Sequence, residues 1–187
     1  FKFVKAIKET IPNVYFYYRK KLDIGEMINF AKEKGFSALM VITEEVKKPV
    51  RMTICHLLGD GLTIELKLND IIYRDEIAGA AVPSEHNPEV IFKNFKTKLG
   101  LRLQRAFTTL FPKEEELVGR RVVTFHNQRD YIFFRHHRYQ FDEDLQSVRL
   151  QEIGPSFTLR LLSIQKGFFE RESGDFEFNY IKKLHKE

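Results

Sequence analysis

The segment "DIGEMINFAKEKG" (23–35) restricts the fold more than any other, because it marks both ends of a helix. Asp23 is placed to cap the first turn, and Glu26, three residues later, completes a capping box. Gly35 provides the C-terminal exit from the helix. Segments rich in apolar and β-branched residues, typical of strands, follow at 37–45, 50–57 and 62–68. A capped helix followed by strands predicts an α/β fold.

The same order of elements returns later in the chain. A strand-like segment at 90–95 precedes a helical pattern at 98–111, which Pro112 ends. The strand-like segments after it are 121–126, 131–141, 148–153, 157–164 and 176–181. In the first half, a helical pattern over 3–11 and the aromatic strand-like "VYFYY" (14–18) come before the capped helix. Residues 79–89 lack periodicity, so we expect them to link two similar strand–helix–strand halves, 1–85 and 86–187.

Positive charge is concentrated in one part of the chain. The net charge is +5 and the pI is about 9.2. Residues 1–85 are nearly balanced, with 13 lysines and arginines against 12 acids, whereas residues 91–141 hold 11 against 4. This distribution is typical of a surface that binds a polyanion. We therefore expect nucleic acid to be a partner, although many basic proteins carry only solvated basic faces.

Other classes of function find little support in the sequence. No apolar run approaches the ~20 residues of a membrane span. The single cysteine, Cys55, excludes a disulfide framework and indicates a reducing compartment, the cytosol or nucleus. The chain begins with Phe1 and lacks a signal-peptide pattern, so we expect it to be part of something longer.

Catalytic and metal-binding motifs are also missing from the sequence. There is no nucleophile elbow, phosphate-binding loop or dinucleotide fingerprint. His136 and His137 are adjacent on an expected strand, where neighbouring side chains point to opposite faces and cannot share a metal ion. We expect one of them to be packed and the other to meet solvent. The sequence predicts no enzyme, no metal and no cofactor, and Cys55 is expected to be a small core residue.

Two segments carry the basic residues in a pattern. On the 98–111 helix, one face is apolar, and another carries Lys98, Arg102 and Arg105 without an acid placed to pair with them. On the 131–141 strand, one face runs from Tyr131 through Arg135 and His137, and the other carries Arg138. Guanidinium groups beside rings suit RNA, because the charge meets phosphates and the flat groups stack on bases. The alternatives are a solvated helix face and a half-buried edge strand that its arginines shield.

Longer stretches of the chain resemble a known family. "GRRVVTFHNQRDYIFFRHHRYQF" (119–141) and "LQEIGPSFTLRLLSIQKG" (150–167) resemble the signature half of the Brix domain. That domain defines a family of eukaryotic ribosome-assembly factors with archaeal relatives. Residues 3–13 and 87–112 resemble its entry helix and its central strand and helix, so the resemblance covers nearly the whole chain.

The resemblance implies a fold and a function. The fold would be a Brix domain of two similar α/β halves, each resembling the anticodon-binding domain of class IIa aminoacyl-tRNA synthetases. The function would be binding of large-subunit (pre-60S) precursor rRNA in the nucleolus, together with a protein partner of the maintenance-of-killer type. The alternative is a protein-interaction scaffold whose RNA contacts lie outside this domain. The residues that we expect to contact RNA, on one basic surface shared by helix and strand, are Lys98, Arg102, Arg105, Arg120, Arg121, Arg129, Arg135, His137, Arg138 and Lys166.

Overall fold

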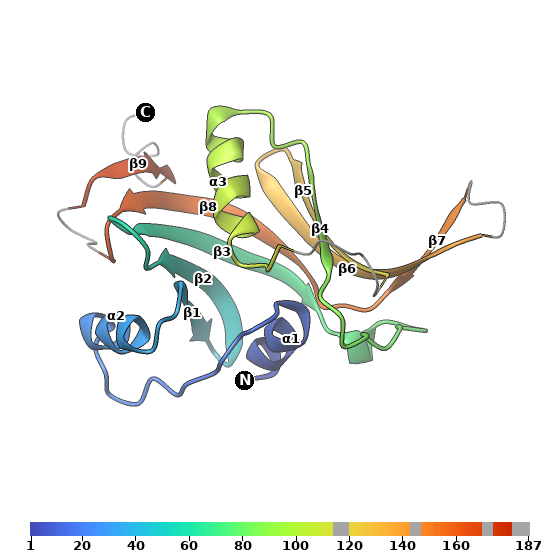
Figure 1. The fold of residues 1–187 in the computed structure, drawn as a ribbon, viewed down its shortest axis with the longest axis horizontal. Helices are drawn as coiled ribbons and strands as arrows, with labels where there is room; N and C mark the ends of the chain where they lie inside the picture. Colours follow the sequence, from blue (N-terminus) through green and yellow to red (C-terminus); the bar gives the residue numbers. More distant parts are fainter. Residues whose placement is uncertain (114–119, 143–146, 170–173, 181–187) are drawn as a thin grey trace. The chain divides into compact units, whose positions relative to one another are not determined.

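The computed structural model describes residues 1–113, 120–142, 147–169 and 174–180. These residues form three α-helices, one short 3-10 helix (η1, Arg74–Glu76) and nine strands (Figure 1). Contacts group the chain into two compact units. Unit 1 comprises residues 1–16 and 69–159, and unit 2 comprises residues 17–68 and 160–187. The predicted α/β class is confirmed.

Unit 2 is built on the capped helix that the sequence predicts. Helix α2 (Ile24–Glu33) begins with a complete capping box, because the carboxylates of Asp23 and Glu26 each accept the other residue's backbone N–H at 2.8 Å. Gly35 follows the helix with φ +74°, a conformation that glycine adopts at little cost. The antiparallel strands of this unit are β1 (Ala38–Glu45), β2 (Lys48–His56) and the first part of β3 (Leu62–Ile72).

The apolar face of α2 packs on β2. Ile28 and Ala31 of the helix form a buried cluster with Cys55 and Leu57. Cys55 has no exposed surface, and burial raises the pKa of its thiol, so it is a protonated core residue. The sequence-based expectation of a core cysteine is confirmed.

Unit 1 is a second helix-and-sheet layer. Helix α3 (Lys98–Thr108) connects the parallel strands β4 (Glu89–Lys93) and β5 (Arg121–Gln128), and a parallel pair needs such a crossover. Thr97 caps this helix by accepting the backbone N–H of Gly100 at 3.0 Å. The other elements of the unit are α1 (Lys2–Thr10), β6 (Tyr131–Phe141), β7 (Val148–Glu152) and the first part of β8 (Ser156–Lys166). Strand β9 (Phe176–Asn179) pairs with the end of β8 in unit 2.

Stacked phenylalanines form the core of unit 1. Phe107 of α3 stacks on Phe125 of β5, with ring centroids 4.8 Å apart. Phe134 of β6 stacks on Phe157 of β8 at 4.3 Å, and Phe3 of α1 meets the edge of the Phe157 ring at 5.4 Å. Since Phe125 and Phe134 are paired in register, both helices pack on the same face of the unit 1 strands.

The segment at 14–18 is not a strand, and that prediction was wrong. Its backbone has no regular structure, and Tyr15, Tyr17 and Tyr18 are each more than half exposed. Aromatic content favours a strand only where neighbouring strands and a buried face are available. Here the rings contact other elements instead, as Tyr17 does with Phe30 of α2 at 5.2 Å.

The two compact units are not two consecutive halves of the sequence. Strand β3 passes from unit 2 into unit 1 after Leu68, and β8 passes from unit 1 into unit 2 after Leu159. Each unit is therefore assembled from separate segments, because two eleven-residue strands contribute to both. The division at residue 85 stays a prediction about internal duplication. Among the described residues, no helix combines the length and the hydropathy that crossing a membrane requires.

Candidate nucleic-acid interface

The β5–β6 hairpin carries most of the basic residues that the sequence singled out. Arg129 and Asp130 form its turn with φ of 51° and 64°, as a type I′ turn requires. The turn fixes the register, which pairs Thr124 with Arg135 and Arg121 with Arg138. Because side chains alternate along a strand, this register distributes the arginines over two faces.

The face that carries Arg135 points away from the phenylalanine core. Phe133, Arg135 and His137 are all partly exposed on this face. The guanidinium carbon of Arg135 lies 5.7 Å from the centroid of the Phe133 ring, and Arg135 Nη1 donates to the carbonyl oxygen of Phe134 at 2.8 Å. These contacts hold a flat cation beside a ring, which is the arrangement that stacks on unpaired bases. We call Phe133, Arg135 and His137 the strand face.

His137 takes part in the strand face as a neutral ring. Burial lowers its pKa below the ordinary histidine value, with Arg135 adding to the effect and Glu152 opposing it. The imidazole is therefore uncharged near pH 7, and it offers a hydrogen bond or a stacking surface in place of a phosphate-binding charge. From the sequence, His137 was expected on a basic surface, whereas in the structure it is an uncharged member of the strand face.

The second basic group lies on α3. Lys98 and Arg105 are exposed and Arg102 is partly exposed, whereas Leu103, Ala106 and Phe107 are buried. The helix therefore has the amphipathic pattern that the sequence predicted. We call Lys98, Arg102 and Arg105 the helix stripe.

The helix stripe and the strand face lie on opposite sides of the unit 1 strands. Helix α3 packs on the face that bears Phe125 and Phe134, and Figure 1 shows it beside β5. Arg135 follows Phe134 directly, so it points to the other face. The expectation of one continuous basic surface was wrong for Arg135 and His137, because the parity of the strand separates them from α3.

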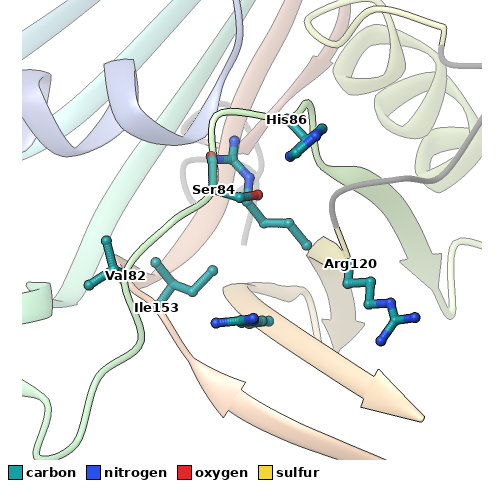
Figure 2. A pocket seen from close by; sticks show the side chains of 7 residues that line it. Val82, Ser84, His86, Arg120 and Ile153 are labelled. Carbon is teal, nitrogen blue, oxygen red and sulfur yellow. The ribbon is translucent and has the colours of Figure 1, made fainter.

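Three arginines border a pocket on the helix side of the hairpin. The pocket has a volume of about 420 Å³ and is lined by Val82, Ser84, His86, Arg120, Arg121, Arg138 and Ile153 (Figure 2). Arg120 and Arg138 are exposed. The three arginines were among the RNA contacts expected from the sequence, whereas Ser84 and His86 were not. The irregular segment 79–89, which contains both of them, has no motif that would indicate a site.

Arg121 differs from its exposed neighbours. Its side chain is only 7% exposed, and its guanidinium donates to the carbonyl oxygens of Ser84, at 2.7 Å, and Thr10, at 3.4 Å. Burial lowers its pKa. Arg121 thus ties the end of α1 and the 79–89 segment to β5, a structural role that its sequence neighbours do not reveal.

The remaining candidates lie apart from these groups. Arg129 is exposed at the hairpin turn, at the end opposite to Arg138. Lys166 is exposed at the end of β8, and its ammonium group forms an ion pair with Asp175 at 2.7 Å. The acid neutralises part of the charge that the sequence assigned to RNA.

His136 has the packed position that one of the paired histidines was expected to take. It is fully buried, and burial lowers its pKa to about 4. The ring is neutral, and because a carbonyl oxygen can only accept a hydrogen bond, Nδ1 carries the proton and donates to the carbonyl oxygen of Gly154 at 2.8 Å. Within the described ranges, no group of three His, Cys, Asp or Glu side chains has the arrangement of a metal site.

Comparison with known proteins identifies the class. The Brix domain profile matches residues 1–163 of the chain. A probable ribosomal biogenesis protein from Aeropyrum pernix K1 has a similar fold, with a TM-score of 0.59 at 15% identity, over 84% of this chain and 86% of that one. The chain belongs to the Brix domain family.

Curated relatives agree with the family. Ribosome production factor 1 of Danio rerio is 44% identical over 185 residues, which cover 98% of this chain and 55% of that protein. Ribosome production factor 1 of Saccharomyces cerevisiae is 40% identical over 171 residues, or 91% of this chain and 57% of that protein. The resemblance of the chain to the Brix domain family is thereby confirmed. The chain spans about half the length of these relatives.

Proposed function

We propose that the chain is a ribosome biogenesis factor that binds precursor rRNA of the large subunit and assists pre-60S assembly and rRNA processing. The names of its relatives support the biogenesis role, and its basic residues support RNA as the ligand. It acts by holding RNA and not by catalysis, since neither the sequence motifs nor the described side chains suggest a reaction.

The observation that carries this proposal is the placement of Arg135 beside Phe133. A guanidinium held against a ring on a partly exposed strand provides both charge and a flat surface. The helix stripe adds charges that suit phosphates, because RNA binding combines both kinds of contact. RNA bound to unit 1 would therefore contact the ring and guanidinium of the strand face on one side of the strands. On the other side, its phosphates would contact the cations of the helix stripe.

The place of action and the partner follow from the family resemblance. We propose that the protein works in the nucleolus, in a pair with an assembly factor of the maintenance-of-killer type and among other pre-60S factors. A reduced, buried Cys55 is compatible with a nuclear location.

A second candidate function is a protein-interaction scaffold. Strand β4 ends the strand order of unit 1, and Ile91 on it is 44% exposed. The edge of a sheet is a template on which a partner's strand can pair. In this case the partner would occupy β4, and RNA contacts would lie in other parts of the longer protein.

Crosslinking separates the two functions. Ultraviolet crosslinking of the protein within assembling particles, read at single-residue level, should connect Phe133 and its neighbours on β6 to large-subunit precursor rRNA. Crosslinks from β4 to a protein, without any from β5, β6 or α3 to RNA, would favour the scaffold.

A further inference from the structure

The pocket beside the β5–β6 hairpin has the composition of an anion site. We call it the arginine pocket, and its lining residues are those given above. Three of the seven are arginines, His86 and Ser84 add hydrogen-bonding groups, and none of these described residues is acidic. Guanidinium groups match phosphate oxygens in geometry and in charge.

Among the residues that the structure describes, the hydrogen-bond acceptors of the buried Arg121 in this pocket carry no charge. Only 7% of Arg121 is exposed, and its guanidinium donates to the carbonyl oxygens of Ser84 and Thr10, which are neutral acceptors. Its Nε–H has no hydrogen-bond partner in the described part of the chain. A buried charge without an opposite charge is costly, so an anion entering this pocket would relieve that cost.

The wall of the pocket is fixed before any ligand arrives. The backbone N–H of Ala81 donates to the carbonyl oxygen of Glu152 at 2.8 Å, and the Gln151 amide donates to that of Gly79 at 2.9 Å. On the other side, the N–H of Tyr139 donates to the carbonyl oxygen of Arg120 at 2.8 Å. These bonds hold the irregular 79–86 segment and Arg120 in place, which reduces the entropy lost on binding.

One side of the pocket is apolar. Figure 2 shows Val82 and Ile153 on one side and Arg120 on the other. Ile153 is buried and Val82 is 77% exposed, so the apolar side opens to solvent. A ligand that matches both sides carries an anion at one end and a flat or apolar group at the other. The volume of about 420 Å³ lies in the usual range for a small-molecule site.

We propose that the arginine pocket binds a single nucleotide of an RNA strand, with its phosphate at Arg120 and Arg138 and its sugar or base against Val82 and Ile153. Arg121 supports the site by holding the Ser84 carbonyl and by adding positive potential. The proposal rests on the proposed function for the source of the nucleotide, but the pocket itself is tested with a mononucleotide alone.

The test is a titration of the whole chain, isotopically labelled, with adenosine 5′-monophosphate, followed by nuclear magnetic resonance. We expect saturable shifts of the His86 ring and the Ile153 methyl groups. Adenosine and inorganic phosphate should each cause smaller shifts at the same residues. Arg138→Gln should lower the affinity for the mononucleotide about tenfold, which corresponds to the loss of a charged hydrogen bond.

Arg149→Gln is the matched control. It removes the same charge from unit 1, but Arg149 lies on β7, its side chain is 81% exposed, and it forms an ion pair with Asp142 at 2.7 Å. The control should bind the mononucleotide as the parent chain does. Equal weakening by both variants would overturn the proposal, because it would show attraction by net charge alone. Shifts that never saturate, or that miss His86 and Ile153, would overturn it as well.

A parallel titration with a large-subunit precursor rRNA fragment separates this proposal from the proposed function. Suppose that Arg138→Gln binds the rRNA fragment as the parent chain does and that no mononucleotide binds in the pocket. This result would overturn the proposal that the pocket binds a nucleotide, and it would not contradict the proposed function. A mononucleotide that saturates the pocket, with no binding of the rRNA fragment, supports the pocket and contradicts the proposed function.

Discussion

Arg121 of β5 and Arg138 of β6 are direct partners across the hairpin, yet one is buried and the other is exposed. Like charges placed opposite each other on a sheet normally repel. Here the Arg121 guanidinium is directed to the carbonyl oxygens of Ser84 and Thr10, whereas Arg138 is exposed. The pair therefore divides into a residue that stabilises the unit and a residue that is available to a ligand.

This division predicts very different effects on stability. Arg121→Ala should lower the free energy of unfolding by about 1–3 kcal/mol, because the carbonyl oxygens of Ser84, which is partly buried, and Thr10, which is buried, lose their donor. Arg138→Ala should change it by less than about 0.5 kcal/mol, as exposed substitutions usually do. Urea denaturation of both variants measures the difference. An equal loss of stability in the two variants would show that Arg138 also stabilises the fold.

The buried imidazole of His136 predicts a loss of stability in acid. Its pKa is about 4 in the folded protein, against about 6.5 in an unfolded chain. Between these values the unfolded chain binds more protons, so stability falls as the pH drops from 6.5 towards 4 and is fully present above 6.5. The resulting loss in the free energy of unfolding is up to about 3 kcal/mol.

Variants at the two histidines test this assignment. Urea denaturation at pH 7.5 and pH 5 should show a smaller difference in His136→Gln than in the parent chain. His137→Gln should have a weaker effect in the same direction, since burial lowers the pKa of His137 too. An unchanged pH dependence in His136→Gln would place the titrating group elsewhere.

The helix stripe predicts a salt-dependent contribution to RNA binding. Each neutralised phosphate contributes about 0.7 to the slope of log affinity against log salt for single strands, and about 0.9 for duplexes. Arg102→Ala with Arg105→Ala should therefore weaken binding across RNA sequences and reduce the slope by about 1.4 for a single strand. Fluorescence anisotropy from low to moderate salt measures both quantities.

Two controls accompany that experiment. Circular dichroism should show an intact fold, because the buried residues of α3, such as Leu103 and Phe107, are unchanged. Arg149→Ala removes one charge outside the stripe and should leave the slope unchanged. If the double variant keeps the parent slope, the phosphates lie on another face.

Local signals in the sequence predicted part of this structure well. The capping box of Asp23 and Glu26 and the exit at Gly35 fix α2 because all three act within one helix. The alternation along β6 likewise predicted that Arg135 and Arg138 would lie on opposite faces.

What depends on distant segments could not be read from the sequence. The burial of Arg121 arises from carbonyl groups 37 and 111 residues away in the chain. The 14–18 segment has the composition of a strand but meets rings instead of a neighbouring strand. The side of the sheet that α3 covers depends on the stacking of Phe107 on Phe125, which no local pattern encodes.

The strand face predicts a contribution to RNA binding that does not depend on salt. Phe133→Leu keeps an apolar side chain on β6 but removes the ring beside Arg135, so it should lose about 1–3 kcal/mol of affinity for single-stranded RNA while the salt slope stays the same. Anisotropy at several salt concentrations distinguishes this pattern from the charge effect of the helix stripe. Because the two groups lie on opposite sides of the unit 1 strands, Phe133→Leu combined with Arg102→Ala and Arg105→Ala should give nearly additive losses. A reduced salt slope in Phe133→Leu alone would mean that the ring positions a phosphate contact. Unchanged affinity in a folded Phe133→Leu chain would contradict base stacking on this face, and it would leave the helix side as the binding surface.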